Sequence, residues 1–333
     1  MSSIKSEEIT VSAEGVRAAA IRLKGKAVRT PLIENEILNE RAGGRVFLKA
    51  EVLQRYGSFK FRGAYNLISQ LTDEQRKNGV LAWSSGNHAQ GVALASRLVG
   101  AKATIVMPDD APEIKARNVR ALGADIVSYD RYKEDREAIA MTIVRERNMA
   151  LAPSYDHPHI VEGQGTLALE TYEDAAELGV TLDAFIACCG GGGLTSGCAT
   201  ILEEVSPETA VWIAEPEGYD EAWASIQAGE RLQADVTKPT ICDAIATPSP
   251  GWLTFPILQR LVRGGVTITE HEVRDAMMFA YEHLKLVVEP GGAVALAAIL
   301  SQKFDSKGKA TAVTLSGGNV DPSLFASVLR NRA

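Results

Sequence analysis

The stretch LDAFIACCGGGGLTSGCATILEEV, residues 182–205, contains the features that decide the fold. Its first part is almost wholly apolar, as in a buried strand, and its last part has the spacing of a helix. The glycines from Gly190 to Gly193 join the two parts, and four in a row are more than a tight turn needs. Glycine lets the backbone approach a ligand closely, and the N–H groups of a helix N-terminus attract anions. This stretch therefore predicts a strand, a turn and a helix that together cradle a phosphate group.

Similar strand–helix units recur along the chain. Apolar runs bounded by Gly, Pro or polar residues predict strands at 80–85, 103–108, 124–130, 182–189, 210–216 and 310–316. Helical patterns follow four of them, at 89–100, 112–123, 133–147 and 194–205. Nearly continuous apolar strands separated by helices indicate an α/β fold with parallel sheets that are covered on both faces. We expect a small domain at 81–152, inserted into a large domain that consists of 1–80 and 153–333.

The composition excludes several classes of protein. Of the 333 residues, 46% are hydrophobic and 23% are charged, which is normal for a globular protein with a buried core. The formal net charge of −7 disfavours a general nucleic-acid-binding surface, and no apolar run is long enough to cross a membrane. The acidic N-terminus lacks the features of a signal peptide, so we expect a cytoplasmic protein. The four cysteines include no CxxC pair, so we expect neither a disulfide framework nor a zinc site.

A lysine between two aromatic residues stands out in GSFKFRGAYN, residues 57–66. Lys60 has two interpretations. It is either a surface lysine whose stem packs on a phenylalanine, or a partly desolvated amine with a lowered pKa that can form a Schiff base. Lys60 alone does not decide between them.

Three further stretches place polar groups or glycines next to predicted helices. LSGGNVD, 315–321, puts Ser316 at the carboxyl end of a strand, where open α/β sheets bind ligands. VEPGGAVALAA, from Val288, has Glu289 just before a pair of glycines. SSGNHAQG, 84–91, follows another strand and contains more polar residues than one helix cap needs: Ser84, Ser85, Asn87 and His88. We therefore expect SSGNHAQG to offer hydrogen-bond donors to a carboxylate.

The order GSFKFRGA, SSGNHAQG, EGQGTLALE (162–170), GGGGLTSG, EPGGA and SGGNVD resembles one family. It is similar to the pyridoxal-phosphate enzymes of the tryptophan-synthase-β fold, fold type II, and within them to the serine/threonine dehydratases and serine racemases. The resemblance runs from about Arg29 to Asp321. It implies two α/β lobes with the cofactor in the cleft between them, and a homodimer. It also implies β-elimination of a hydroxy amino acid, first of all L-threonine or L-serine, to a 2-oxo acid and ammonia.

The resemblance also implies a role for each matching residue. Lys60 would carry pyridoxal 5′-phosphate as a Schiff base and would remove the substrate α-proton. Ser316 would face the pyridine nitrogen, where a hydroxyl leaves the ring a weaker electron sink than a carboxylate does. Ser85 matches a serine that reprotonates the substrate in the racemases. The cofactor contacts would be Phe59, Lys60, Asn87, Gly190, Gly191, Gly192, Gly193, Leu194, Glu289 and Ser316. The substrate contacts would be Ser84, Ser85, Asn87, His88 and Arg136.

Two further positions bear on metal binding and on the choice of substrate. AEPEGYDEAW, 214–223, resembles a divalent-cation loop, in which Glu215, Glu221 and the carbonyl of Tyr219 would hold Mg²⁺ or Ca²⁺. The alternative is an acidic loop in contact with solvent. Arg136 matches an arginine that lies near the active site of serine racemases, and it could hold the second carboxylate of 3-hydroxyaspartate. The alternative, which we favour, is a surface arginine paired with its neighbours Glu134 or Asp135.

Several functions compete with the dehydratase interpretation. A serine racemase and a 3-hydroxyaspartate dehydratase would use the same scaffold, and so would a β-replacement enzyme. A non-catalytic protein that binds phosphate ligands would not need Lys60. A nicotinamide-dependent dehydrogenase would need GxGxxG and an acidic residue downstream, which we do not find. The chain ends soon after SGGNVD, so we expect a catabolic form without a C-terminal regulatory domain.

Overall fold

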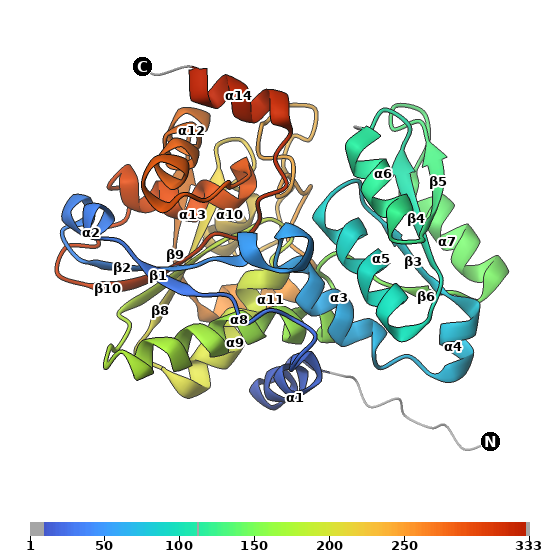
Figure 1. Cartoon of the computed structure of the whole chain (residues 1–333), viewed down its shortest axis with the longest axis horizontal. Coiled ribbons are helices and arrows are strands. Elements are labelled where there is room, and N and C mark those ends of the chain that lie inside the picture. The colour runs from blue at the N-terminus through green and yellow to red at the C-terminus, as the bar shows by residue number, and fades with distance from the viewer. Residues whose placement is uncertain (1–9, 112, 331–333) are drawn as a thin grey trace.

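The larger of two sheets forms the centre of the molecule. The computed structural model describes residues 10–111 and 113–330. Six strands lie in the order β1-β2-β10-β7-β8-β9 (Figure 1). Strand β1 is antiparallel to β2, and all other neighbours are parallel. The strands are β1 (Leu32–Glu34), β2 (Arg45–Lys49), β7 (Ala184–Cys188), β8 (Ala210–Pro216), β9 (Val262–Ile268) and β10 (Ala310–Thr314).

A second, smaller sheet lies beside the first. Its order is β5-β4-β3-β6, and every neighbouring pair is parallel. Its strands are β3 (Val80–Trp83), β4 (Ala103–Pro108), β5 (Asp125–Tyr129) and β6 (Ala150–Leu151). All the predicted strands are present in the two sheets, so the predicted α/β class with mainly parallel sheets is confirmed.

Helices cover both faces of each sheet, as parallel sheets require. Figure 1 shows α1, α8, α9 and α11 on one side of the large sheet and α2, α12 and α13 on the other, and α10 contacts α11 and β9. The helices are α1 (Ala13–Leu23), α2 (Glu36–Ala42), α3 (Lys60–Ile68), α4 (Asp73–Asn78), α5 (Asn87–Val99), α6 (Glu113–Ala121), α7 (Arg136–Arg147), α8 (Pro158–Glu177), α9 (Gly193–Val205), α10 (Glu221–Ala228), α11 (Thr254–Leu261), α12 (Glu270–Phe279), α13 (Pro290–Leu300) and α14 (Pro322–Arg330). Short turns of other helix types are η1 (Glu51–Leu53), η2 (Arg55–Gly57) and the π-helical η3 (Ala280–Leu284).

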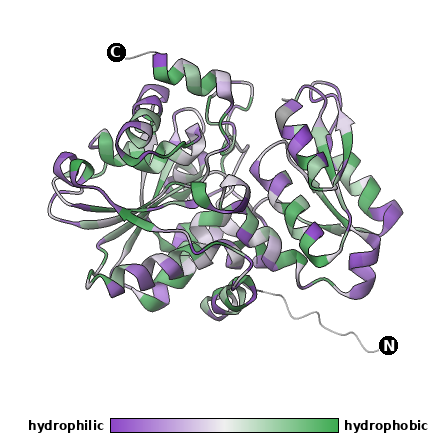
Figure 2. Ribbon diagram, in the orientation of Figure 1, coloured by the Kyte–Doolittle hydropathy of each residue, from purple (hydrophilic) through white to green (hydrophobic). Residues whose placement is uncertain are grey.

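The apolar residues follow this layering. Helix α13 is apolar on all sides, and nearly all of it is buried against the parallel strands of the large sheet. Figure 2 shows hydrophobic residues along the strands and hydrophilic ones on the outward faces of the helices. Within residues 10–111 and 113–330, no helix is long and apolar enough to span a bilayer.

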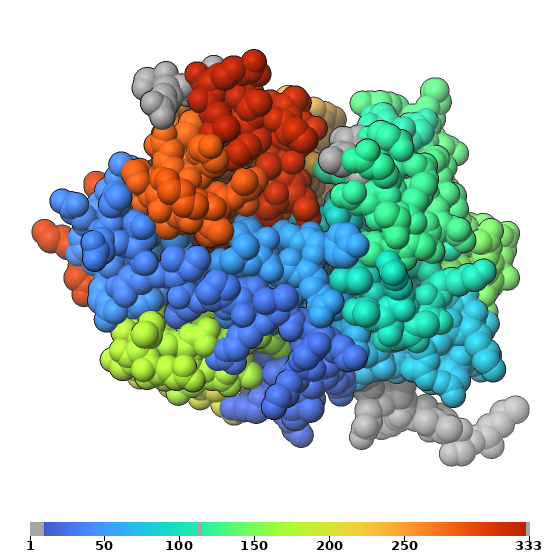
Figure 3. Space-filling model, in the orientation of Figure 1, coloured from blue at the N-terminus to red at the C-terminus, as the bar shows by residue number. Residues whose placement is uncertain are grey.

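Helix α3 connects the two lobes. It contacts α8 of the large lobe and α5 of the small lobe. Its residues Phe61, Tyr65 and Ile68 belong to the hydrophobic core beneath the small sheet. Figure 3 shows the lobes in contact along this face, with the chain of η1, η2 and α3 running across the boundary. The small sheet runs from Val80 to Leu151, α3 also contributes to its core, and the proposed boundaries at 81 and 152 stay a prediction.

A buried group of charges fixes the start of α3. Arg62 is fully buried and forms two-pronged hydrogen bonds with Glu51 of η1 and with Glu170 of α8, at 2.7–2.8 Å. Lys49, also fully buried, pairs with Glu170 at 2.9 Å. The Arg62 guanidinium and Lys49 keep the pKa of Glu170 below its usual value, despite the opposing effect of burial. Because Arg62 is in the first turn of α3, these ion pairs set the position of Lys60.

Candidate active site

Two stretches that are far apart in the sequence lie side by side at the carboxyl end of β10. Ser58 and Gly317 form an antiparallel bridge, and the Phe59 N–H donates to the Ser316 carbonyl at 3.1 Å. The side-chain amide of Asn319 donates to the carbonyl of Tyr56 at 2.7 Å. This pairing brings the predicted cofactor lysine, which follows Phe59 directly, to the same end of the sheet as Ser316.

Lys60 is the first residue of α3 and lies in a half-buried position. Its Nζ lies 5.2 Å from the centre of the Phe59 ring and donates to the carbonyl of Ser154 at 2.9 Å. Burial lowers the pKa of Lys60 to about 8, although Glu289 nearby partly opposes this change. With that pKa, roughly one amine in ten is neutral at pH 7. The geometry favours the nucleophilic interpretation of Lys60 over that of a solvated surface lysine.

The four glycines form the turn between β7 and α9, as the sequence predicts. Gly192 has φ of +89°, a left-handed conformation that is costly for other residues, and it caps α9. The N–H groups in the first turn of α9 have no intrahelical acceptors. A Cβ on Gly191 would overlap the ring of Tyr155, so the close contact with Tyr155 also requires glycine at position 191. The turn lines the same cavity as Lys60 and leaves backbone donors for an anion.

The stretch from Ser84 to His88 runs from the end of β3 into the first turn of α5 and lines this cavity too. Its N-cap, Gly86, has no side-chain cap, so the first N–H groups of α5 are open to a ligand. His88 Nε2 contacts the Ala152 carbonyl at 2.8 Å, and burial lowers the pKa of His88 to about 3. His88 is therefore neutral, and the group it can offer to a carboxylate is its backbone N–H.

Asn87 connects the two lobes through its side chain. Its amide donates to Glu289 Oε1 at 2.5 Å and accepts from Asn319 at 2.7 Å. Burial raises the pKa of Glu289 to about 7, although the bond from Asn87 opposes this. Glu289 stands directly before α13, so the predicted contacts Asn87, Glu289 and Ser316 converge from three separate elements.

The cavity has a volume of about 530 Å³, enough for a cofactor and a small substrate. All the predicted cofactor and substrate residues line it, from Phe59 to Ser316. Sequence reasoning assigned no role to the segment 231–252, which forms one wall. There, Arg231 stacks 3.8 Å from the ring of Trp252 and donates to Ser249 at 2.7 Å. Asp243 pairs with Lys115 of the small lobe at 3.0 Å, and both residues line the cavity.

The alternative that we favoured for Arg136 holds in part: Arg136 is an exposed residue of α7, but the expected pairing with Glu134 or Asp135 is missing from the described ion pairs. Glu134 accepts from the N–H of Asp130, and Asp135 accepts from the N–H groups of Glu137 and Ala138 as the cap of α7. No ion pair joins Arg136 to any carboxylate in the described residues. Arg136 is exposed and lines the cavity, so its guanidinium is free to meet a ligand.

The predicted cation loop runs from the end of β8 to the start of α10. Both oxygens of Glu215 accept backbone N–H groups, from Ala222 at 3.1 Å and Trp223 at 2.8 Å. Glu221 Oε1 accepts from Thr247 at 3.1 Å, whereas Oε2 is buried and has no hydrogen-bond partner. Burial raises the pKa of Glu221 to about 7 and that of Glu215 well above its usual value. Within the described chain, no three acidic, histidine or cysteine side chains form a metal-binding group.

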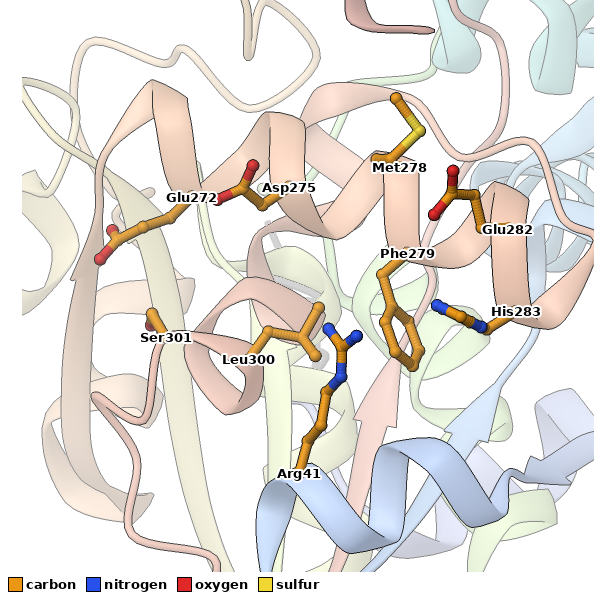
Figure 4. Close-up of a pocket in the computed structure, with 9 residues that line it drawn as sticks. All are labelled: Arg41, Glu272, Asp275, Met278, Phe279, Glu282, His283, Leu300 and Ser301. Atoms are coloured by element: carbon orange, nitrogen blue, oxygen red, sulfur yellow. The ribbon is translucent and has the colours of Figure 1, made fainter. Parts of the chain in front are cut away.

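A smaller pocket of about 300 Å³ lies elsewhere, between α2, α12, η3 and the end of α13 (Figure 4). Arg41 lies over the ring of Phe279 at 5.1 Å, and carboxylates of α12 line the pocket. Its lining contains no lysine and no glycine turn. The larger cavity therefore remains the candidate active site.

A lysine with a lowered pKa beside a phosphate cradle, between two α/β lobes, defines a class of enzymes that carry pyridoxal phosphate. The chain belongs to the family described as "Pyridoxal-phosphate dependent enzyme", whose profile matches residues 23–318. An L-threo-3-hydroxyaspartate ammonia-lyase of Pseudomonas sp is 44% identical over 94% of this chain and 96% of its own. A serine racemase of Schizosaccharomyces pombe is 40% identical over 95% of this chain and 96% of its own. The crystal structure of a threonine deaminase from T.th. matches with a TM-score of 0.88 and 41% identity, over 93% of this chain and 99% of that one. The predicted family and its fold type II architecture are thereby confirmed.

Proposed function

We propose that the protein removes water from 3-hydroxy amino acids by β-elimination and releases ammonia and a 2-oxo acid. The observation that carries this proposal is the position of Lys60, which lines one cavity together with the glycine turn, Ser316 and the N-terminus of α5. The relatives named for ammonia-lyase activity cover nearly the whole chain, which supports the same reaction class.

The residues of the cavity fit pyridoxal phosphate. The N–H groups from Gly190 to Leu194 would hold the phosphate, Phe59 would flank the ring, and Ser316 would face the ring nitrogen. Bound pyridoxal phosphate supplies an aldehyde that condenses with amines and a conjugated ring that accepts an electron pair from the α-carbon. A hydroxyl group at the ring nitrogen suits an elimination, because the leaving group carries the electron pair away.

The side chains of this protein then have separate tasks. The Lys60 Nζ takes the proton from the substrate α-carbon, and its lowered pKa leaves part of the amine neutral at pH 7. The N-terminus of α5, with Ser84 and Ser85, holds the α-carboxylate. The β-hydroxyl leaves as water, and the released enamine hydrolyses to the 2-oxo acid and ammonia.

A second candidate substrate, 3-hydroxyaspartate, is favoured by the unpaired guanidinium of Arg136. A charge-assisted bond to a second carboxylate contributes about 1.5–3 kcal/mol. We therefore expect Arg136→Leu to lower kcat/KM for L-threo-3-hydroxyaspartate by about 10- to 150-fold. The same change should leave kcat/KM for L-serine nearly unaltered, because serine has no second carboxylate. The measurement is 2-oxo acid release from L-threonine, L-serine and the threo and erythro 3-hydroxyaspartates.

Arg147→Leu, at the other end of α7, is the matched control and should change neither rate. An equal loss for both substrates in Arg136→Leu would contradict the role of Arg136. No 2-oxo acid from any of these amino acids would contradict the proposed reaction itself.

Chiral analysis of the remaining substrate tests the racemase alternative, in which Ser85 would return a proton to the other face. Enantiomer that forms faster than 2-oxo acid would make racemisation the main reaction.

We also propose that Glu215, Glu221 and the Tyr219 carbonyl hold Mg²⁺ or Ca²⁺. The unpartnered, buried Oε2 of Glu221 supports this, because a cation would compensate it. Saturating cation should then stabilise the protein against unfolding by about 2–3 kcal/mol. The measurement is thermal unfolding in the presence of the cation and in the presence of EDTA. Glu221→Gln should abolish that gain, whereas Glu208→Gln, on the surface, should keep it. An unchanged melting temperature in the presence of both cations would exclude the site.

A homodimer is the assembly that we propose. Leu53, Tyr56 and Val287 are exposed apolar side chains, and their segments flank the turn at Gly318 and Asn319. Burying them against a second copy would remove apolar surface from water next to the cofactor lysine segment. Sedimentation equilibrium of the purified protein measures the assembly directly. The expectation of a cytoplasmic protein stays a prediction.

A further inference from the structure

One hydrogen bond in the cavity joins Cys188 to Ser316, and the proposed reaction assigns no role to Cys188. Cys188 ends β7, and Ser316 follows β10, the neighbouring strand of the large sheet. The Cys188 thiol donates to the Ser316 hydroxyl oxygen, with 3.2 Å between Sγ and Oγ. Both side chains are buried, with exposed fractions of 3% and 4%, and both line the cavity beside Lys60.

The protonation state of Cys188 is consistent with the thiol as the donor in this bond. Burial raises the pKa of Cys188 to about 11, so the side chain is a neutral thiol at pH 7 and can donate its proton. A thiolate would instead accept the single proton of the Ser316 hydroxyl. Because the neutral thiol occupies a lone pair of Ser316 Oγ, the hydroxyl proton is free to point elsewhere. Ser316 lines the cavity, so an acceptor bound there can take this proton.

We propose that Cys188 is a positioning residue that turns the Ser316 hydroxyl into a hydrogen-bond donor toward the ring nitrogen of the cofactor. This proposal rests on the proposed function, which places that nitrogen at Ser316. A donor at this position requires an unprotonated nitrogen, since a protonated one has no lone pair to accept the bond. Cys188 therefore keeps the ring in its weaker electron-accepting form, which favours elimination over reactions that need a long-lived carbanion.

The test compares Cys188→Val, which keeps the volume but has no donor, with Cys188→Ser, which keeps a donor. Each protein is loaded with pyridoxal phosphate labelled with ¹⁵N in the ring, and the nitrogen resonance is recorded. We expect a downfield shift in Cys188→Val, because the bond from a less polarised hydroxyl is weaker, and a resonance close to wild type in Cys188→Ser. The kcat for L-serine should fall by about 2- to 10-fold in Cys188→Val with little change in KM.

Cys198→Ala removes another buried thiol, from the core side of α9, and should leave the resonance unchanged. An unchanged resonance in Cys188→Val would overturn the proposal, and so would a protonated ring nitrogen in the wild type. Failure of the wild type to bind the labelled cofactor, or to eliminate any hydroxy amino acid, would instead contradict the proposed function. The resonance and the turnover therefore separate the two outcomes.

Discussion

Lys60→Ala is expected to lose at least about 10³-fold in kcat for every hydroxy amino acid, because the variant has no base for the α-proton. The variant should still bind pyridoxal phosphate, since the glycine turn and Ser316 remain. It should not acquire the visible absorbance of the cofactor bonded to a lysine. The measurements are 2-oxo acid release and the absorption spectrum of the loaded protein.

Two controls separate this loss from a loss of folding. Lys102→Ala removes an exposed lysine outside the cavity and should keep the full rate. A small primary amine added to Lys60→Ala should restore part of the turnover, because it can enter the space that the lysine leaves. Elimination at the wild-type rate in Lys60→Ala would contradict the role of Lys60.

Arg62→Leu is expected to lower the free energy of unfolding by about 3–5 kcal/mol, because it leaves the fully buried carboxylate of Glu51 with only the neutral donors Thr30 and Gln54. Glu170 loses the same guanidinium but keeps Lys49, so its share of the loss is smaller. Urea unfolding of the variant and the wild type without cofactor measures the difference.

Arg17→Ala is the matched control for this prediction. Arg17 pairs with Glu204 at 2.5 Å, but about half of both side chains is exposed. Solvent screens such pairs, so the loss should stay within about 1 kcal/mol. A loss of that small size in Arg62→Leu would show that the charges around Glu51 do not hold α3 in place.

The parts of the fold that the sequence predicts well are those with a local signal. The strand β7, the glycine turn and α9 follow one another without a gap, and each has its own pattern. The sequence does not predict strand β9, VRGGVTI, because a pair of glycines inside a strand resembles a turn. The structure supplies the reason for these glycines. A Cβ on Gly264 would overlap the ring of Trp212, and one on Gly265 the ring of Trp223.

The residues of the candidate site likewise fall into those with a local sequence signal and those without one. Lys60, Ser316 and the glycine turn stand in compact motifs, so the sequence could place them in one site. The wall formed by 231–252 is irregular and has no periodic pattern, so nothing local points to Arg231 or Asp243. That Arg136 lacks an ion pair in the described residues could not be predicted either. Its neighbours Glu134 and Asp135 have the right charge, but their oxygens are used by backbone N–H groups.

The measurement that tests the central claim most directly is borohydride reduction of the protein loaded with pyridoxal phosphate, followed by mass spectrometry of its peptides. Reduction converts the bond between cofactor and lysine into a stable one and so marks the lysine that carries the cofactor. We predict a phosphopyridoxyl group on the peptide that contains Lys60 and on no other lysine peptide. A label on a different lysine, or none after loading with excess cofactor, would contradict the assignment of this cavity as the active site.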